Sequence, residues 1–186
     1  MGLHVDQYFT WKNHIEIIAS KIAKNIGVIS RISYLIPTNT RLTLYYSLIY
    51  PYIAYCNMIW ASNYTHRLQR IILLQKRILR IIAGSSWNAH ADPLFKHYRI
   101  LKLTQIKQKQ LNEFMHRCIF NTLPTNFSNL FTFSSDLHSY NIRNPSLVRT
   151  IFARTNSRRF SIRVAGPAAW NALPKDLQSI PNLNLF

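Results

Sequence analysis

The chain has 186 residues, and 48% of them are hydrophobic, so it can bury a substantial core and is not a disordered polymer. Its 23 Lys and Arg residues face only 6 Asp and Glu residues, which gives a formal net charge of +17. Self-repulsion of that size indicates a polyanionic partner, with nucleic acid as the first candidate and an anionic membrane surface as the second.

The two cysteines, Cys56 and Cys118, stand far apart in apolar stretches. Two thiols are too few for a disulfide framework or a zinc cage, and they fit a reducing compartment. The first residues lack the charged region and apolar run of a secretory signal. We therefore expect a nuclear or cytoplasmic protein that is not secreted.

The first predicted helix follows a short segment, residues 1–6, whose weak alternation is compatible with one end of a strand. Apolar residues spaced by threes and fours then form one stripe, from Trp11 to the residue before Pro37. Lys24 and Arg31 fall on the opposite side of this helix. Its charged face is therefore basic.

The next segment, residues 42–60 (LTLYYSLIYPYIAYCNMIW), contains no charged residue. Its length is near the lower limit for a membrane span, but five tyrosines, Asn57 and Pro51 lower its hydrophobicity. We expect a buried helix that is capped within residues 38–40 and kinked near Pro51. A membrane-associated protein anchored by residues 42–60 is the alternative.

A third helix is predicted from about Thr65 to Ala83, with Gly84 as its C-terminal cap. At 100° per residue, one broad apolar face contains Leu68, Ile71, Ile72, Leu74, Ile78, Leu79 and Ile82. The other side carries the sharpest basic stripe in the chain: Arg70, Lys76, Arg77 and Arg80.

Two more helices are expected before the pattern changes. Asp92 is positioned to cap a brief helix, and a fourth long helix starts near Thr104 and ends before Pro124. Its first half is expected to show three lysines to solvent: Lys102, Lys107 and Lys109.

Helical periodicity disappears from about Pro124, where Ser, Thr and Asn become frequent. The segment Phe160–Ser161–Ile162 could form a strand, and Pro167 could open a short helix that Pro174 closes. A cluster made only of arginine, the side chain suited to bidentate phosphate contacts, runs through this region: Arg143, Arg149, Arg154, Arg158, Arg159 and Arg163.

Several segments together resemble the region downstream of the palm in reverse transcriptases of non-long-terminal-repeat (LINE-like, jockey-like) retrotransposons. The opening MGLHVDQYFTW resembles the LGVxxDxxLxW hairpin between palm and thumb. LYYSLIYPYIAYCNMIW is similar to LYxSLIxPxLxYCxxxW, and LLQKRILRII to LQxKxxRxI. RRFSIRVAGPAAWNALP matches SFxxxGPxxWNxLP. These matches keep the family's order and span nearly the whole chain.

The resemblance implies a piece of an RNA-directed DNA polymerase that acts on a nicked target. Its catalytic residues would lie in a palm upstream of position 1, and both ends of the chain look like truncations. Residues 1–10 would be a remnant of the palm–thumb hairpin, 11–123 a helical thumb-like domain, and 124–186 an Arg-rich element with the GPxxWNxLP segment. The expected fold is mainly α, a thumb-like helical bundle with a small irregular α+β C-terminal element.

Chemistry is not expected from this chain alone. Two-metal nucleotidyl transfer requires clustered carboxylates, whereas the six acids stand apart in the sequence: Asp6, Glu16, Asp92, Glu113, Asp136 and Asp176. His116 and Cys118, like His90 and His97, lack the cysteine pair of a zinc site. We expect no metal, no cofactor and no small-molecule substrate.

The basic stripes favour binding to the backbone of RNA or of an RNA–DNA hybrid, with DNA as a further possible ligand, because solvated helix faces usually mix both signs of charge. A third interpretation is a transposon remnant with no function. The residues expected to contact phosphate are Lys24, Arg31, Arg70, Lys76, Arg77, Arg80, Arg154, Arg158 and Arg159.

We predict that the purified chain incorporates no nucleotides, because it lacks a carboxylate pair for two cations. Primer extension with Mg²⁺ and deoxynucleotides measures this. Template-dependent product above a no-protein control would contradict the prediction.

Overall fold

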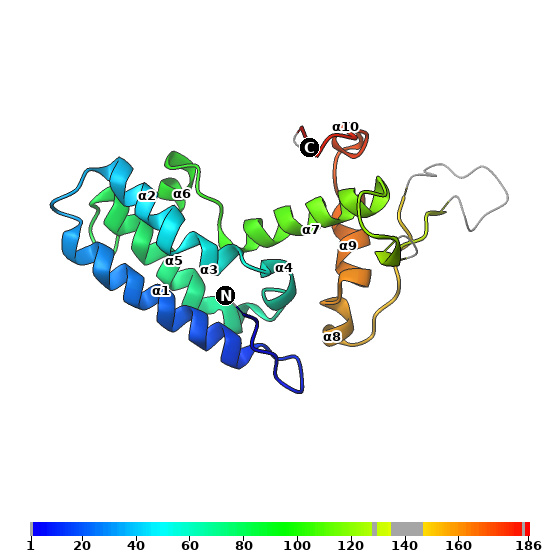
Figure 1. Cartoon of the computed structure of the whole chain (residues 1–186), viewed down its shortest axis with the longest axis horizontal. Coiled ribbons are helices and arrows are strands. Elements are labelled where there is room, and N and C mark those ends of the chain that lie inside the picture. Colours follow the sequence, from blue (N-terminus) through cyan, green and yellow to red (C-terminus); the bar gives the residue numbers. More distant parts are fainter. Residues whose placement is uncertain (1, 128–129, 135–146, 184) are drawn as a thin grey trace. The chain divides into compact units, whose positions relative to one another are not determined.

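Figure 1 shows a computed structural model of the chain, which describes residues 2–127, 130–134, 147–183 and 185–186. The chain is mainly helical, as predicted, and divides into two compact units, Met1–Lys107 and Gln108–Phe186. The first unit contains α1 (Lys12–Ile32), α2 (Thr38–Leu48), α3 (Tyr50–Ala54), α4 (Asn57–Trp60), α5 (Thr65–Ala83) and α6 (Asp92–His97). The boundary between the two units falls within α7 (Leu103–Ile119).

Helices α1 and α5 pack along each other and run in the same direction (Figure 1). Their starting ends are held together by Asn63 Nδ2 and Arg67 Nη1, which donate to the Thr10 carbonyl at 2.7 and 3.1 Å. At the other end, Arg41 at the start of α2 donates through Nη1 to the carbonyls of Ile81 and Ile82, at 3.1 and 2.8 Å. Helix α2 therefore runs back against the long pair.

The core of this unit is formed by the isoleucine stripe of α1. Ile22, Ile26 and Ile29 are fully buried and belong to one apolar cluster with residues of α5, including Ile71 and Ile78. β-branched side chains have one strongly preferred rotamer in a helix, so such a seam loses little side-chain entropy on packing. Helix α1 ends at Ile32, four residues before the end of the stripe.

Helix α5 matches its predicted bounds. Gly84 adopts φ 64°, the left-handed conformation that favours glycine, and its N–H donates to the Ile81 carbonyl at 3.2 Å. The predicted apolar face is buried or half-buried throughout. The sequence did not indicate that Gln75 is also buried, with 1% of its surface exposed.

The segment 42–60 is not one kinked helix but parts of three. The helix is interrupted at Ile49, two residues before Pro51, which lies in the first turn of α3. It is interrupted again before α4, at Cys56, where φ is 49°. Proline cannot donate the backbone hydrogen bond that would continue α2. The N-terminal cap of α2 was expected within residues 38–40, and this prediction is wrong because the cap residue is Pro37.

This segment packs into the core through residues that follow one another at intervals of four and, at the end, three. Tyr45, Ile49, Ile53, Asn57 and Trp60 are all buried completely. Among the described residues, no helix combines the length and apolarity needed to span a bilayer.

Gln75 connects three parts of the first unit. Its Nε2 donates to the Tyr45 hydroxyl at 3.2 Å and to the Leu101 carbonyl at 2.8 Å, while its Oε1 accepts from Leu103 N–H at 3.0 Å. One amide thus joins α2, α5 and the start of α7. Burial raises the pKa of Tyr45 to about 12, so this hydroxyl stays neutral.

The described residues of the second unit contain the rest of α7 and the short helices η1 (Thr125–Phe127), α8 (Asn156–Arg159), α9 (Ile162–Asn171) and α10 (Lys175–Gln178). Its core contains Met115, Val148 and Trp170. The side chain of Asn171 pairs with the backbone of Val148 through an N–H···O and an O···H–N bond, at 2.8 and 3.1 Å. The GPAAWNALP segment is therefore a packing element.

Glycine at position 166 leaves room for the Met115 side chain of α7, which would have to shift if a larger residue stood there. A Cβ on Gly166 would lie 2.6 Å from Sδ of the buried Met115. Pro167 follows inside α9, so the prediction that this proline opens the helix is wrong. The helix begins at Ile162, which also removes the strand expected at 160–162. In the described residues, the β structure of this unit is a single bridge, Phe133–Val148.

Three further predictions need correction. Residues 2–6 form no strand; instead, His4 N–H donates to Nδ1 of His14 at 3.3 Å. Asp92 is the first residue of α6 and not its cap. Lys107 is half-buried, and its pKa is lowered by desolvation.

We predict that Gln75→Leu lowers the free energy of unfolding by about 2–4 kcal/mol, because it leaves buried polar groups of three elements without their partner. Urea denaturation followed by circular dichroism measures the loss. Gln69→Leu is the matched control on the exposed side of α5 and should change stability by no more than about 0.5 kcal/mol. Equal effects of the two substitutions would show that the Gln75 bonds are not important.

Candidate nucleic-acid interface

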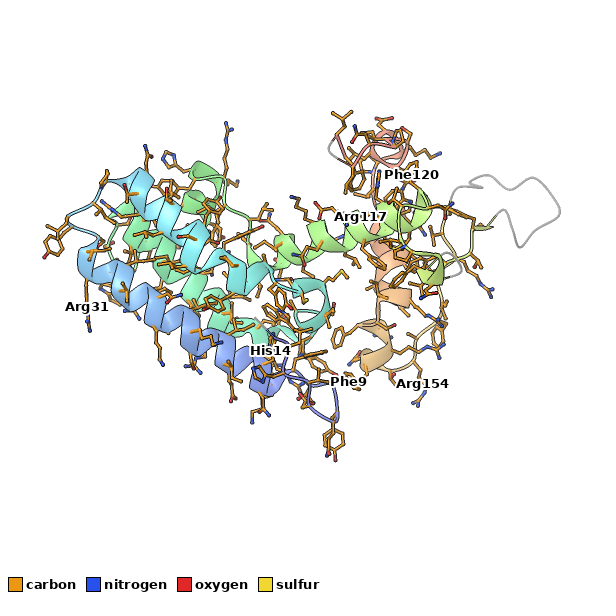
Figure 2. The ribbon with its side chains drawn as sticks, in the orientation of Figure 1. Phe9, His14, Arg31, Arg117, Phe120 and Arg154 are labelled. Atoms are coloured by element: carbon orange, nitrogen blue, oxygen red, sulfur yellow. The ribbon has the colours of Figure 1, made fainter. Side chains whose placement is uncertain are left out.

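Two of the predicted phosphate-binding residues lie on α1. Lys24 and Arg31 are both exposed, and Figure 2 shows Arg31 projecting from α1 into solvent. They are seven residues apart, which is nearly two helical turns and roughly 10.5 Å along the axis. They therefore share one face of the helix.

The basic stripe of α5 divides into two edges. Arg70 and Arg77, also seven residues apart, are exposed, whereas Lys76 and Arg80 are half-buried. Arg80 Nε donates to the Ala89 carbonyl at 2.7 Å and so holds the loop after α5. The sequence indicated one continuous stripe, but the structure uses Arg80 partly for local packing.

Lys76 lies on the edge of α5 that faces α6. It lines a hollow of about 220 Å³ together with Asp92 and Lys102. The pKa of the Asp92 carboxyl is lowered, first by the Lys102 hydrogen bond and charge, and further by the charge of Lys76. A carboxylate thus accompanies the cations at this edge.

The other edge of α5 meets α1. Lys24 and Arg70 line one open groove of about 880 Å³, which Lys21 also lines. Because α1 and α5 run in the same direction and each repeats a cation after seven residues, Arg31 and Arg77 continue the two rows. We call Lys24, Arg31, Arg70 and Arg77 the α1–α5 basic face.

Acidic residues do little to neutralise this face. In the described ranges the ion pairs are Lys102–Asp92 at 2.9 Å and Lys109–Glu113 at 3.4 Å, and neither involves it. Asp6 accepts from the Thr10 N–H at 2.8 Å, within its own turn, and this bond lowers its pKa. Glu16 is the acid that lines the groove, opposite three cations.

In the second unit, Arg154, Arg158 and Arg159 are exposed on α8 and the residues before it. Figure 2 shows the Arg154 side chain extending into solvent. Arg159 is partly engaged, because its Nε donates to the Ala153 carbonyl at 3.2 Å. Arg149 and Arg163 are also exposed, and Arg143 lies outside the described residues.

Lys21 and His14 were not among the expected site residues. The packing of residues 3–5 beside α1 makes Lys21 part of a groove, which a single helix pattern does not report. His14 was not singled out, since a lone histidine on an apolar stripe carries no functional signal. No group of three His, Cys, Asp or Glu side chains that could hold a metal occurs in the part of the chain that the structure describes.

Comparison with protein-family models, with curated proteins and with solved structures gives no match.

The two edges of α5 should respond differently to mutation. We predict that Arg80→Gln lowers the free energy of unfolding by about 1–2 kcal/mol, because the loop carbonyl of Ala89 loses a charged donor. Arg77→Gln should change it by no more than about 0.5 kcal/mol, because Arg77 is exposed. Urea denaturation of both variants is the measurement. A larger loss of unfolding free energy for Arg77→Gln than for Arg80→Gln would refute the division of α5 into a packed edge and an exposed edge.

Proposed function

We propose that this chain is a nucleic-acid-binding fragment of a retrotransposon reverse transcriptase and grips the backbone of RNA or an RNA–DNA hybrid without sequence choice. The observation that carries the proposal is the α1–α5 basic face, in which two parallel helices present cations at the same spacing. Nuclear or cytoplasmic localisation, with DNA as a further ligand, belongs to the same proposal.

The spacing suits a phosphate backbone. In B-form DNA, the further ligand of this proposal, each strand carries one phosphate per roughly 3.4 Å of axis, so cations roughly 10.5 Å apart meet phosphates about three steps apart. Contacts to phosphate supply affinity and orientation but carry no sequence information. A fragment of this kind holds a duplex and leaves the choice of sequence to other parts of the enzyme.

The segments that resemble the reverse transcriptase family support the proposed ancestry through their structural roles. Gln75, from LLQKRILRII, joins three elements of the first unit. Trp170, from GPAAWNALP, belongs to the core of the second unit, and the side chain of Asn171 bonds to the backbone of Val148. Motifs with such roles persist when a fold is kept, whatever the chemistry upstream.

Catalysis is not part of this proposal. Two-metal chemistry requires carboxylates that lie close enough together to share cations. In each of the two ion pairs among the described residues, a single carboxylate faces a lysine. The function proposed for the chain alone is binding.

We predict that changing Lys24, Arg70 and Arg77 together to Gln weakens binding to all sequences alike. The slope of log affinity against log salt should become shallower by about 2 to 2.7, since each lost phosphate contact contributes about 0.7–0.9. Fluorescence anisotropy with a hybrid duplex and with RNA, at several salt concentrations, measures both quantities. Gln is a good helix former, so the circular dichroism spectrum should not change.

The matched control carries the same loss of charge in the same unit: Lys12, Lys96 and Arg99, all exposed, changed together to Gln. It should retain most of the parent's affinity and salt slope. If both triple variants behave alike, binding depends on net charge and not on the α1–α5 basic face. If the parent binds neither duplex at low salt, the proposed function is wrong.

A further inference from the structure

The most exposed phenylalanine among the described residues lies in the arginine-rich part of the second unit. Phe152 is 83% exposed, and the neighbouring Ile151 is 40% exposed. Residues 147–163 around it contain five arginines and no acid. A lone exposed apolar side chain is ordinary, but an exposed aromatic ring among several cations is a candidate binding surface.

The segment that carries Phe152 is held at both of its ends. Val148 is buried, and its backbone N–H and carbonyl both bond to the side chain of Asn171 in α9, at 3.1 and 2.8 Å. Ala153 is also buried, and its carbonyl accepts from Arg159 Nε at 3.2 Å. The residues between these two anchors are exposed. Because the backbone is fixed on either side of Phe152, less entropy is lost when a ligand binds to its ring.

Guanidinium groups flank Phe152 on both sides along the chain. Arg149 precedes it by three residues and Arg154 follows it by two, and both are exposed. The bond to the Ala153 carbonyl brings Arg159 to the same place, and it uses one guanidinium N–H and leaves the others for a ligand. The two ion pairs of the described ranges involve none of these arginines. We call Arg149, Phe152, Arg154 and Arg159 the Phe152 patch.

This combination of side chains suits an unpaired strand better than a duplex. Guanidinium groups bond to phosphate oxygens, often through two N–H groups at once, in either form of nucleic acid. An aromatic ring adds affinity only where the face of a base is open, and in a duplex neighbouring base pairs cover those faces. The unstacked bases of single-stranded RNA present them.

A lipid surface fits the same residues less well. Anionic headgroups would attract the arginines, but binding at a membrane surface draws on a broad apolar face. Between Val148 and Ala153, the large apolar side chains that are exposed are Ile151 and Phe152. Single-stranded nucleic acid requires no more than one ring beside cations, so it is the partner that the patch favours.

We propose that the Phe152 patch binds single-stranded RNA, with the Phe152 ring stacked on one unpaired base and the three arginines bonded to phosphates on either side. This deepens the proposed function, on which it rests for nucleic acid as the polyanion, and assigns a different form of the ligand to the second unit. The α1–α5 basic face holds a backbone through charge, whereas the Phe152 patch also holds a base.

Fluorescence anisotropy with a single-stranded RNA oligonucleotide and the whole chain tests the stacking contact. We expect Phe152→Ala to weaken binding by about fivefold or more, which is the effect of an alanine substitution where one base stacks. The slope of log affinity against log salt should stay the same, because no phosphate contact is lost. Phe152→Tyr, which keeps a ring, should bind like the parent. Changing Arg149 and Arg154 together to Gln should instead make the slope shallower by about 1.4.

Three matched controls separate stacking from other effects. Tyr34→Ala removes an aromatic side chain of similar exposure, 81%, from the first unit and should leave the affinity for the strand unchanged. An abasic oligonucleotide of the same length keeps the phosphates, so the parent and Phe152→Ala should bind it equally. Phe152→Ala should also leave the affinity for a duplex of the same sequence unchanged.

The outcomes distinguish this site from the α1–α5 basic face. Equal losses on the intact and the abasic strand, or an equal loss in Tyr34→Ala, would overturn the stacking site. Unchanged strand binding by Phe152→Ala would overturn it too, even if the triple change in the α1–α5 basic face still weakens duplex binding. If that variant instead binds the duplex like the parent, while Phe152→Ala loses the strand, the proposed function fails and the Phe152 patch stands.

Phosphatidylserine vesicles test the rival partner. We expect Phe152→Ala to sediment with them as the parent does. Loss of vesicle binding in Phe152→Ala, with strand binding unchanged, would assign the patch to a lipid surface and overturn the proposal.

Discussion

The first unit depends on the amide of Gln75. An uncharged side chain in the middle of α5 supplies two hydrogen bonds from Nε2 and accepts one at Oε1, and its partners belong to α2 and to the entry into α7. Apolar packing of the isoleucine seam is not directional, so it brings helices together without fixing how far one slides along another. The three bonds of Gln75, with the Arg41 bonds at the end of α5, fix that position. The placement of cations on the outer surface follows from this internal arrangement.

The bounds of a helix could be predicted from the sequence where the residues that fix them are close together in the chain. Helix α5 has a periodic stripe and a left-handed glycine at its end, and both act within a few residues, so its bounds were predictable. An interruption near Pro51 was predictable and is found at Ile49, whereas the second break, at Cys56, was not, because no local signal marks it. Pro167 was misplaced for a related reason. Proline is tolerated inside α9 because the packing of Gly166 and Trp170 against the second core holds the helix around it.

The candidate interface shows the same limit. The sequence identified the cations, because a helical projection places Lys24, Arg31, Arg70 and Arg77 away from the apolar stripes. It could not show that Arg80 is bonded to the loop after α5, because that depends on the path of the loop. Nor could it show that Lys24 and Arg70 share a groove, because that depends on which side of α5 meets α1. His14 was missed altogether. Its burial against Trp11 and Trp60 depends on how α4 and the residues before α1 pack, and no pattern of residues in a single sequence reports that packing.

The parallel course of α1 and α5 has a consequence for the electric field around the first unit. Each helix carries a macrodipole with its positive end at the N-terminus, and two parallel helices add their dipoles where an antiparallel pair would cancel them. Neither helix has an acid in its first turn, and Arg41 offsets the negative end of α5. The two dipoles therefore add a positive contribution at the end that contains Thr10 and Asn63, where an acid, Glu16, lines the groove. Arg31, Arg41 and Arg80 lie toward the opposite end, so the side chains and the dipoles together spread the attraction for a polyanion along the pair of helices.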